Sequence, residues 1–153
     1  MPASKLWLAG SQLAFPLDGK RVAFSEQAIS GDNIPVNLFV ADANGEGARA
    51  LVAGGQDPSW SAVGLVAYQV WTDDGWHLHV VDPNTDPDHY LGSWEFGCWS
   101  GDGSSLYVDT TDNYGTTIWQ MRADGSGANV VVSGGSPDWA PKCTCHIVSR
   151  PVR

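Results

Sequence analysis

Carboxylates and aromatic rings alternate in two short segments of this chain. The first segment is Trp71-Thr72-Asp73-Asp74-Gly75-Trp76 and the second is Thr111-Asp112-Asn113-Tyr114-Gly115. Carboxylates beside aromatic rings suit sugars, cationic side chains and quaternary amines. The alternative is that Asp and Gly only form the turns here, while the aromatic rings pack inside the fold. The residues predicted to bind a ligand are Asp57, Trp71, Asp73, Asp74, Trp76, Asp112, Asn113, Tyr114 and Asp138.

A third segment carries oxygen donors at alternating positions, as a calcium loop does. Its candidate metal ligands are Asp82, Asn84, Asp86 and Asp88. A calcium loop also needs Gly at its sixth position and Glu at its twelfth. This chain has Pro87 and Ser93 there. No cofactor is therefore expected, and an acidic turn is favoured over a calcium site.

Other metal-binding and catalytic patterns are sparse. His77 and His79 are two residues apart, so on a strand they would share a face and could bind a metal together, although a third ligand is not evident. Cys143 and Cys145 have one intervening residue, whereas metal sites usually have two. The chain has no G-x-S-x-G, no H-E-x-x-H and no Gly-rich phosphate loop. A binding protein is favoured over an enzyme.

The elements that must position these residues form a repeat. An aromatic residue followed by a short turn recurs at Phe15, Trp60, Trp99 and Trp139, in steps of 45, 39 and 40 residues. A period near forty with strand-forming sequence inside it is typical of a β-propeller, in which one repeat is one four-stranded blade. The fold class predicted is therefore all-β.

Three sets of short β-branched or aromatic runs follow each anchor and are bounded by Gly, Asp and Ser. The first set follows the turn after the anchor, the second ends near an Asp, and the third precedes a Gly-rich return to the next anchor. The members in the second repeat are Leu65-Val66-Ala67-Tyr68, Leu78-His79-Val80-Val81 and Tyr90-Leu91. No window of ten residues has a helical pattern.

The turns of this repeat resemble those of a known family. Asp18-Gly19-Lys20-Arg21-Val22-Ala23-Phe24 and Trp99-Ser100-Gly101-Asp102-Gly103 are similar to the blade signature of TolB-like propellers, also called WD40-like or PD40 repeats. Asp42-Ala43-Asn44-Gly45 is similar to the family's turn between the third and fourth strands. Leu17 and Val63 depart from the signature. The resemblance runs from about Leu6 to Ser149, and it implies a binding scaffold.

The repeats predict one domain over residues 1–153, with blades at about 13–52, 58–92 and 97–132. A partial blade at 137–149 and a strand at 5–9 complement one another. Propellers usually have four to eight blades. We therefore expect a homodimer that closes one six- to eight-bladed ring, because head-to-tail contacts between two chains can form a ring. The alternatives are a fragment of a longer chain and an open monomeric stack.

Propeller topology places the loop between the second and third strands of every blade on one face, which we call the loop face. The candidate ligand-binding residues lie in those loops or in the segments that enter each blade. The function predicted is a non-catalytic scaffold that binds a protein or a small polar ligand at the loop face and central channel. The alternatives are a glycan- or cation-binding module and an accessory propeller of a hydrolase or peptidase.

Composition limits the partners. The formal charge is −9, from 17 acidic and 8 basic residues, which argues against nucleic acid and anionic membranes. No apolar run approaches the roughly 18 residues of a membrane span. The first fifteen residues lack the pattern of an export signal. The chain as given is thus expected in the cytoplasm, whereas the family resemblance implies the cell envelope.

Overall fold

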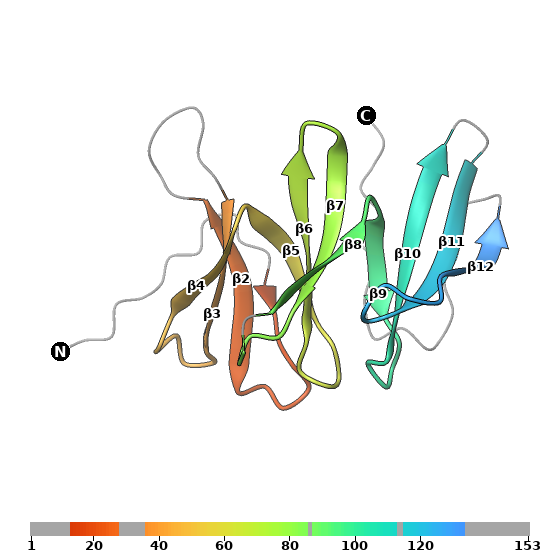
Figure 1. Ribbon diagram of the computed structural model, residues 1–153. Helices are drawn as coiled ribbons and strands as arrows, with labels where there is room; N and C mark the ends of the chain where they lie inside the picture. Colours follow the sequence, from red (N-terminus) through yellow and green to blue (C-terminus); the bar gives the residue numbers. More distant parts are fainter. Residues whose placement is uncertain (1–12, 28–35, 86, 113–114, 134–153) are drawn as a thin grey trace.

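The computed structural model describes residues 13–27, 36–85, 87–112 and 115–133 (Figure 1). The described residues form twelve strands and the loops that join them. The strands make three four-stranded antiparallel sheets, which stand side by side in chain order. The all-β prediction is confirmed. The predicted strand at 5–9 and the partial blade at 137–149 lie outside the described residues.

Each sheet is one blade, and its strands follow one another in sequence order. Blade 1 contains β1 (Leu13–Ala14), β2 (Arg21–Gln27), β3 (Val36–Asp42) and β4 (Arg49–Ala53). Blade 2 contains β5 (Gly55–Trp60), β6 (Val66–Thr72), β7 (Gly75–Val81) and β8 (Asp88–Gly92). Blade 3 contains β9 (Glu95–Trp99), β10 (Ser105–Asp112), β11 (Gly115–Arg122) and β12 (Asn129–Ser133).

The strand register is the same in all three blades. Ala14 pairs with Ala23 in blade 1, Ser59 with Ala67 in blade 2, and Cys98 with Tyr107 in blade 3. The third and fourth strands also share a bulge, because the register shifts after Leu38, Leu78 and Ile118. Residues of different blades can therefore be matched by their place in the register.

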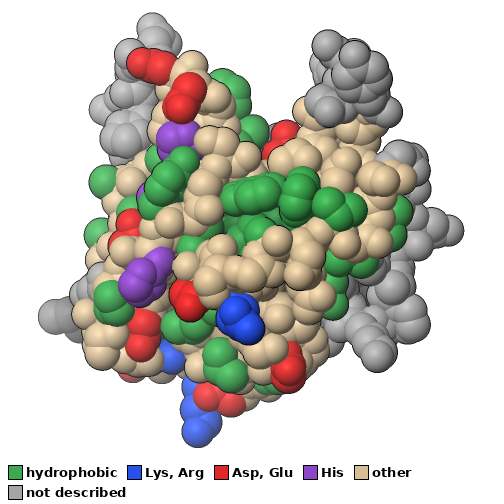
Figure 2. Space-filling model, turned by 45° about the vertical axis from the view of Figure 1, so that its right-hand side comes forward, with side chains coloured by type: hydrophobic (Ala, Val, Ile, Leu, Met, Phe, Trp, Pro, Cys, Tyr) green, Lys and Arg blue, Asp and Glu red, His purple; other side chains and the backbone are tan. Residues whose placement is uncertain are grey.

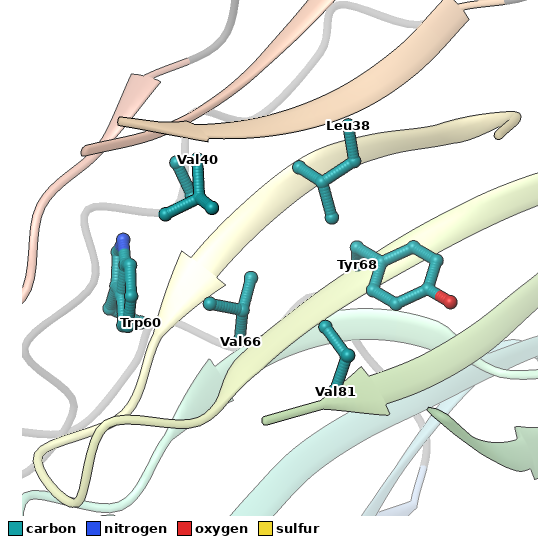
Figure 3. Close-up of a cluster of buried hydrophobic side chains, with 7 residues drawn as sticks. Leu38, Val40, Trp60, Val66, Tyr68 and Val81 are labelled. Atoms are coloured by element: carbon teal, nitrogen blue, oxygen red, sulfur yellow. The ribbon is translucent and has the colours of Figure 1, made fainter. Parts of the chain in front are cut away.

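The core lies between the blades, because alternate residues of a strand point to opposite faces of its sheet. Leu38 and Val40 of β3 face Val66, Tyr68 and Val81 of blade 2, with Trp60 at the edge of the cluster (Figure 3). The next interface repeats this pattern: the buried residues Ala67, Leu78 and Val80 of blade 2 pack against Trp99, Leu106, Val108 and Met121 of blade 3. Blade 2 thus packs against a neighbour on both of its faces.

The anchor aromatic residues connect neighbouring blades by packing and hydrogen bonding. Trp99 is 1% exposed, and its Nε1–H donates to the carbonyl of Ser59, the residue before the anchor of blade 2. Trp60 is 9% exposed, and the guanidinium of Arg21 lies 4.9 Å from the centre of its ring. Gly55 is needed where blades 1 and 2 meet, because a Cβ there would lie 2.8 Å from the Cβ of Leu38.

At the end of the blades opposite the loop face, the acidic residues of the turns have a structural role. The carboxylate of Asp82 accepts a hydrogen bond from the backbone N–H two residues later, and Asp102 and Asp124 do the same. This contact closes a turn without help from the rest of the fold. The side chain of Ser100, followed by the backbone N–H and hydroxyl of Ser104, lowers the pKa of Asp102 to about 2.

Two further features bear on the sequence predictions. Cys98 is 2% exposed and disulfide-bonded, and the two other cysteines lie outside the described residues. In the part of the chain that the structure describes, no helix is long and apolar enough to cross a membrane.

Candidate functional site

The hairpin between β6 and β7 holds the best-defined candidate site. Trp71 pairs with Trp76 and Thr72 with Gly75, so Asp73 and Asp74 form the tip. The rings of Trp71 and Trp76 meet edge to face, with 5.0 Å between their centres and 72° between their planes. Trp71 is 61% exposed, whereas Trp76 is half-buried. The hairpin therefore presents one open aromatic ring that a second ring supports.

The carboxylate of Asp74 is held in a defined position beside these rings. Thr72 Oγ1 lies 2.5 Å from Asp74 Oδ1, and His77 Nε2 lies 3.1 Å from the same oxygen. The hydrogen bond from Thr72, with a smaller contribution from His77, lowers the pKa of Asp74. Asp74 is therefore ionised at neutral pH, and Asp73 adds a second exposed carboxylate at the tip. Four of the predicted binding residues thus lie together on one hairpin.

Asp57 lies elsewhere in blade 2. It is part of β5 and not of the loop that enters the blade, because the chain turns at Gly54 and the strand begins at Gly55. Gln56 pairs with Gln69 and Ser59 with Ala67, so Asp57 lies in a bulge opposite Tyr68. Its φ of 53° is the left-handed conformation, which a bulge can impose on a non-glycine residue. In the register it lies three positions from Trp71.

The other predicted binding residues are less well defined. Asn113, Tyr114 and Asp138 lie outside the described residues, and of Asp112 only the backbone, at the end of β10, is described. Asp112 pairs with Gly115 at the tip of the β10–β11 hairpin. Figure 1 shows this hairpin and the β6–β7 hairpin at the same end of their sheets. The predicted contributions of these four residues stay predictions.

The candidate calcium ligands are used in two different ways. Asp82 Oδ1 accepts hydrogen bonds from the backbone N–H and the side-chain amide of Asn84. The bond from the backbone N–H does most to lower the pKa of Asp82. Asp88 instead starts β8 and contacts Tyr68 and His79. Asp86 lies outside the described residues. Within the described residues, no group of three or more His, Cys, Asp and Glu side chains is arranged to hold a metal ion. The calcium site stays a prediction.

Two polar groups were missed from the sequence. The hydroxyl of Tyr68 donates to Asp88 Oδ1 at 2.8 Å, and burial, aided by this bond, raises the pKa of Tyr68. In blade 3, Asp109 pairs directly with Glu95, and burial together with that neighbouring charge raises the pKa of Asp109 to about 6. The repeat placed these residues on strands, but it did not show which side chains meet across a sheet.

Comparisons with solved structures define the fold. The chain matches TolB from Acinetobacter baumannii with a TM-score of 0.66 and 15% identity, over 83% of this chain and 33% of that one. It matches putative TolB from Agrobacterium tumefaciens with a TM-score of 0.65 and 18% identity, over 82% and 47% of the two chains. It also matches the β-propeller domain of the trilobed protease from Pyrococcus furiosus, with a TM-score of 0.63 and 14% identity, over 84% and 42%.

The chain has a β-propeller fold. The expected resemblance to TolB-like propellers is thereby confirmed at the level of the fold. No family model matches the sequence, and no curated protein does. This propeller chain spans a third to a half of the length of the three structures named above.

Proposed function

We propose that this propeller chain is a non-catalytic binding scaffold whose ligand or protein partner contacts the β6–β7 hairpin at the loop face. The observation that carries this proposal is Trp71, a large apolar ring that is 61% exposed beside two carboxylates. Burying a tryptophan on a ligand releases a large apolar area from water, and aromatic residues are enriched at binding sites. A location in the cell envelope, which the family resemblance implies, is part of the proposal.

The chemistry of the hairpin defines the ligand class. An exposed ring takes up the apolar face of a sugar or a cationic group, and Asp73 and Asp74 can bind hydroxyl or ammonium donors. Because the chain carries a net charge of −9, a cationic or neutral partner is favoured over an anionic one. A glycan or a cationic peptide segment fits this description.

The test is a binding titration followed by tryptophan fluorescence. The probes are neutral hexasaccharides (maltohexaose, cellohexaose and chitohexaose) and an arginine-rich decapeptide. We expect one probe class to bind, and Trp71→Ala to weaken binding at least tenfold. The control is Leu17→Ala. Its side chain is 77% exposed and lies between β1 and β2, at the end of blade 1 opposite the loop face. Equal binding by wild type and Trp71→Ala, or no binding of any probe, would count against the site.

An accessory propeller of a peptidase is the second candidate function. The observation that favours it is the likeness to the propeller domain of the trilobed protease. In that case, we expect the chain to bind a catalytic domain and none of the probes above. A pull-down with the catalytic domain of a peptidase encoded in the same gene or beside it would test this role.

We further propose that a second copy of the chain completes the ring as a homodimer. The anchors Trp60 and Trp99 are buried by the blades that precede theirs, whereas Phe15, the anchor of blade 1, is 56% exposed. Leu13, two residues before it, is 49% exposed. Phe24, which lies in the middle of the same face of blade 1, is buried. The inner edge of blade 1 is therefore open where the other anchors contact a preceding blade.

Light scattering after size exclusion tests this assembly over a dilution series. A mass of twice 16.3 kDa that falls to 16.3 kDa in Phe15→Asp, but not in Leu17→Asp, would support it. A monomer at every concentration would refute the homodimer and leave the hairpin proposal unaffected.

A further inference from the structure

A hydrogen-bonded polar group lies in blade 2 and includes two positions that are apolar in the other blades. The group is Tyr68 on β6, His79 on β7 and Asp88 at the start of β8. Asp88 Oδ1 accepts from the Tyr68 hydroxyl at 2.8 Å, and His79 Nδ1 lies 3.1 Å from Asp88 Oδ2. By register, the residues that match Tyr68 and His79 are Phe24 and Phe39 in blade 1 and Val108 and Trp119 in blade 3.

The fold therefore does not need polar atoms at these positions. Tyr68 is fully buried, and a buried polar group costs stability unless it is hydrogen-bonded, so an apolar pair of rings would be the simpler solution for packing. Blade 1 has that solution, and blade 3 also has apolar side chains at both positions. The polar set in blade 2 consequently indicates a chemical role for His79, which is the one member whose ring still has an unused nitrogen.

The contacts with the carboxylates leave one ring nitrogen of each histidine for a ligand. His79 Nδ1 lies within hydrogen-bond distance of Asp88, so Nε2 is the ring nitrogen that can accept a ligand. The same holds for His77, whose Nε2 lies 3.1 Å from Asp74 Oδ1. In His77 the nitrogen left for a ligand is therefore Nδ1.

The two imidazoles share one face of β7. They are two residues apart, about 7 Å along a strand, and both rings approach the ring of Tyr90, at 5.1 Å for His77 and 5.3 Å for His79. Their side chains are 19% and 17% exposed, so solvent reaches both. Figure 2 shows histidine side chains (purple) among acidic and hydrophobic ones along one edge of the molecule.

We infer that His77 and His79 form a binding site for a divalent transition-metal ion of the Zn²⁺ type, with Asp74 and Asp88 as their hydrogen-bonded supports. Neutral imidazole is a preferred ligand of Zn²⁺, Ni²⁺ and Cu²⁺. Histidines that bind such ions usually donate their other ring N–H to a carboxylate, which orients the ring and raises its basicity. Both histidines have this arrangement. Water or a partner's side chain completes the coordination sphere.

The chain provides a matched control. His89 lies on β8 and pairs with Val80, whose side chain packs toward blade 3, so His89 is on the opposite face of the sheet. It is exposed. His89→Asn therefore removes the same chemical group from the same blade without touching the proposed site.

The first experiment is a calorimetric titration of the full chain with Zn²⁺, with Mg²⁺ as the hard-ion control. We expect one Zn²⁺ per chain and no Mg²⁺. His77→Asn and His79→Asn should each weaken Zn²⁺ binding at least tenfold, and Asp74→Asn should weaken it by about 10- to 100-fold, as loss of a supporting carboxylate does elsewhere. His89→Asn should bind like wild type. Thermal melts without metal show whether each variant folds, and His77→Asn, close to the hairpin tip, is the variant least coupled to the core.

A second readout locates the ion. Substoichiometric Cu²⁺ should broaden the imidazole NMR signals of His77 and His79 before those of His89. The proposal is overturned if wild type takes up no Zn²⁺, if His89→Asn loses as much affinity as the other two variants, or if Cu²⁺ broadens all histidines alike. None of these results bears on ligand binding at Trp71, which is measured separately.

Discussion

Blades 1 and 2 stack two rings at the same place in their sheets, and they do so with different chemistry. In blade 1 the rings of Phe24 and Phe39 lie 5.5 Å apart with 13° between their planes. In blade 2 the rings of Tyr68 and His79 lie 5.2 Å apart with 24° between their planes. The packing is nearly the same, although only the second pair carries polar atoms. The difference separates what the blade needs, a flat ring stack, from what blade 2 adds to it.

Tyr68 and Phe24 are also equally buried, at 0% and 1% exposed. The two rings occupy matching register positions and therefore lie on the same face of their sheets. Because the same volume is filled in both blades, the ring accounts for the packing energy and the hydroxyl accounts only for the contact with Asp88. Substitutions in the two blades can therefore test the ring and the polar atoms separately.

The largest effect should come from removing a ring. Tyr68→Ala and Phe24→Ala should each lower the free energy of unfolding by about 3–5 kcal/mol, because each leaves a cavity that the surrounding strands fill only in part. Chemical denaturation followed by near-UV circular dichroism measures both values. A loss for Tyr68→Ala below about 1 kcal/mol would contradict the view that its ring packs as Phe24 does.

The second prediction converts blade 2 to the chemistry of blade 1. Asp88→Ala alone should cost about 1–3 kcal/mol, since it leaves the buried Tyr68 hydroxyl without an acceptor. The triple variant Tyr68→Phe, His79→Phe, Asp88→Ala should recover most of that loss, because its two rings then match those of blade 1 and no hydroxyl is left without an acceptor. The same denaturation experiment measures it, and the triple variant should bind no Zn²⁺. If the triple variant is less stable than Asp88→Ala, the polar set is part of the blade's packing after all.

The third prediction compares blades 2 and 3 across their first two strands. Gln56 and Gln69 pair in blade 2, and Glu95 and Asp109 pair at the same place in blade 3. Burial and the charge of Glu95 raise the pKa of Asp109 from 3.8 to about 6. The folded state thus binds a proton that the unfolded state releases between these values, so stability is full below pH 3.8 and falls as the pH rises to 6.

Asp109→Gln should remove this pH dependence. At pH 8 we expect its melting temperature to exceed that of wild type by a few degrees, which corresponds to a gain in the free energy of unfolding on the order of 1 kcal/mol or less. At pH 3.5 the two melting temperatures should match. Glu95→Gln, which removes only the neighbouring charge, should give a smaller gain at pH 8. Scanning calorimetry at the two pH values measures the differences, and an equal shift at both would mean that the charge of Asp109 is not the cause.

Sequence reasoning predicted what repeats and missed what is particular to one blade. The spacing of Phe15, Trp60 and Trp99 defined the blades, because every blade needs an anchor ring, a turn and a Gly-rich return. The repeat also placed Trp71 and Trp76 in one loop between the second and third strands of blade 2, and the structure pairs the two residues across the β6–β7 hairpin.

The contacts between Tyr68, His79 and Asp88 could not be predicted in the same way. They join three strands, so they depend on two registers at once, and the bulge after Leu78 shifts the second of these. A bulge of this kind leaves no mark in the pattern of hydrophobic residues. Asp88 also looked like part of an oxygen-rich loop, because its neighbours Asp82 and Asn84 form a turn.

The smallest effect on stability should come from Trp71, and this is what distinguishes it from the buried tryptophans. Because its ring is 61% exposed, Trp71→Ala loses only the edge-to-face contact with Trp76, and we expect a cost of about 0.5–1 kcal/mol. Trp99→Ala, by contrast, removes a ring that is 1% exposed together with its hydrogen bond to Ser59, and should cost about 3–5 kcal/mol. Urea denaturation of both variants measures this contrast. A loss for Trp71→Ala near that of Trp99→Ala would make Trp71 a packing residue, whereas a small loss leaves an exposed ring that the fold does not require and that a ligand can use.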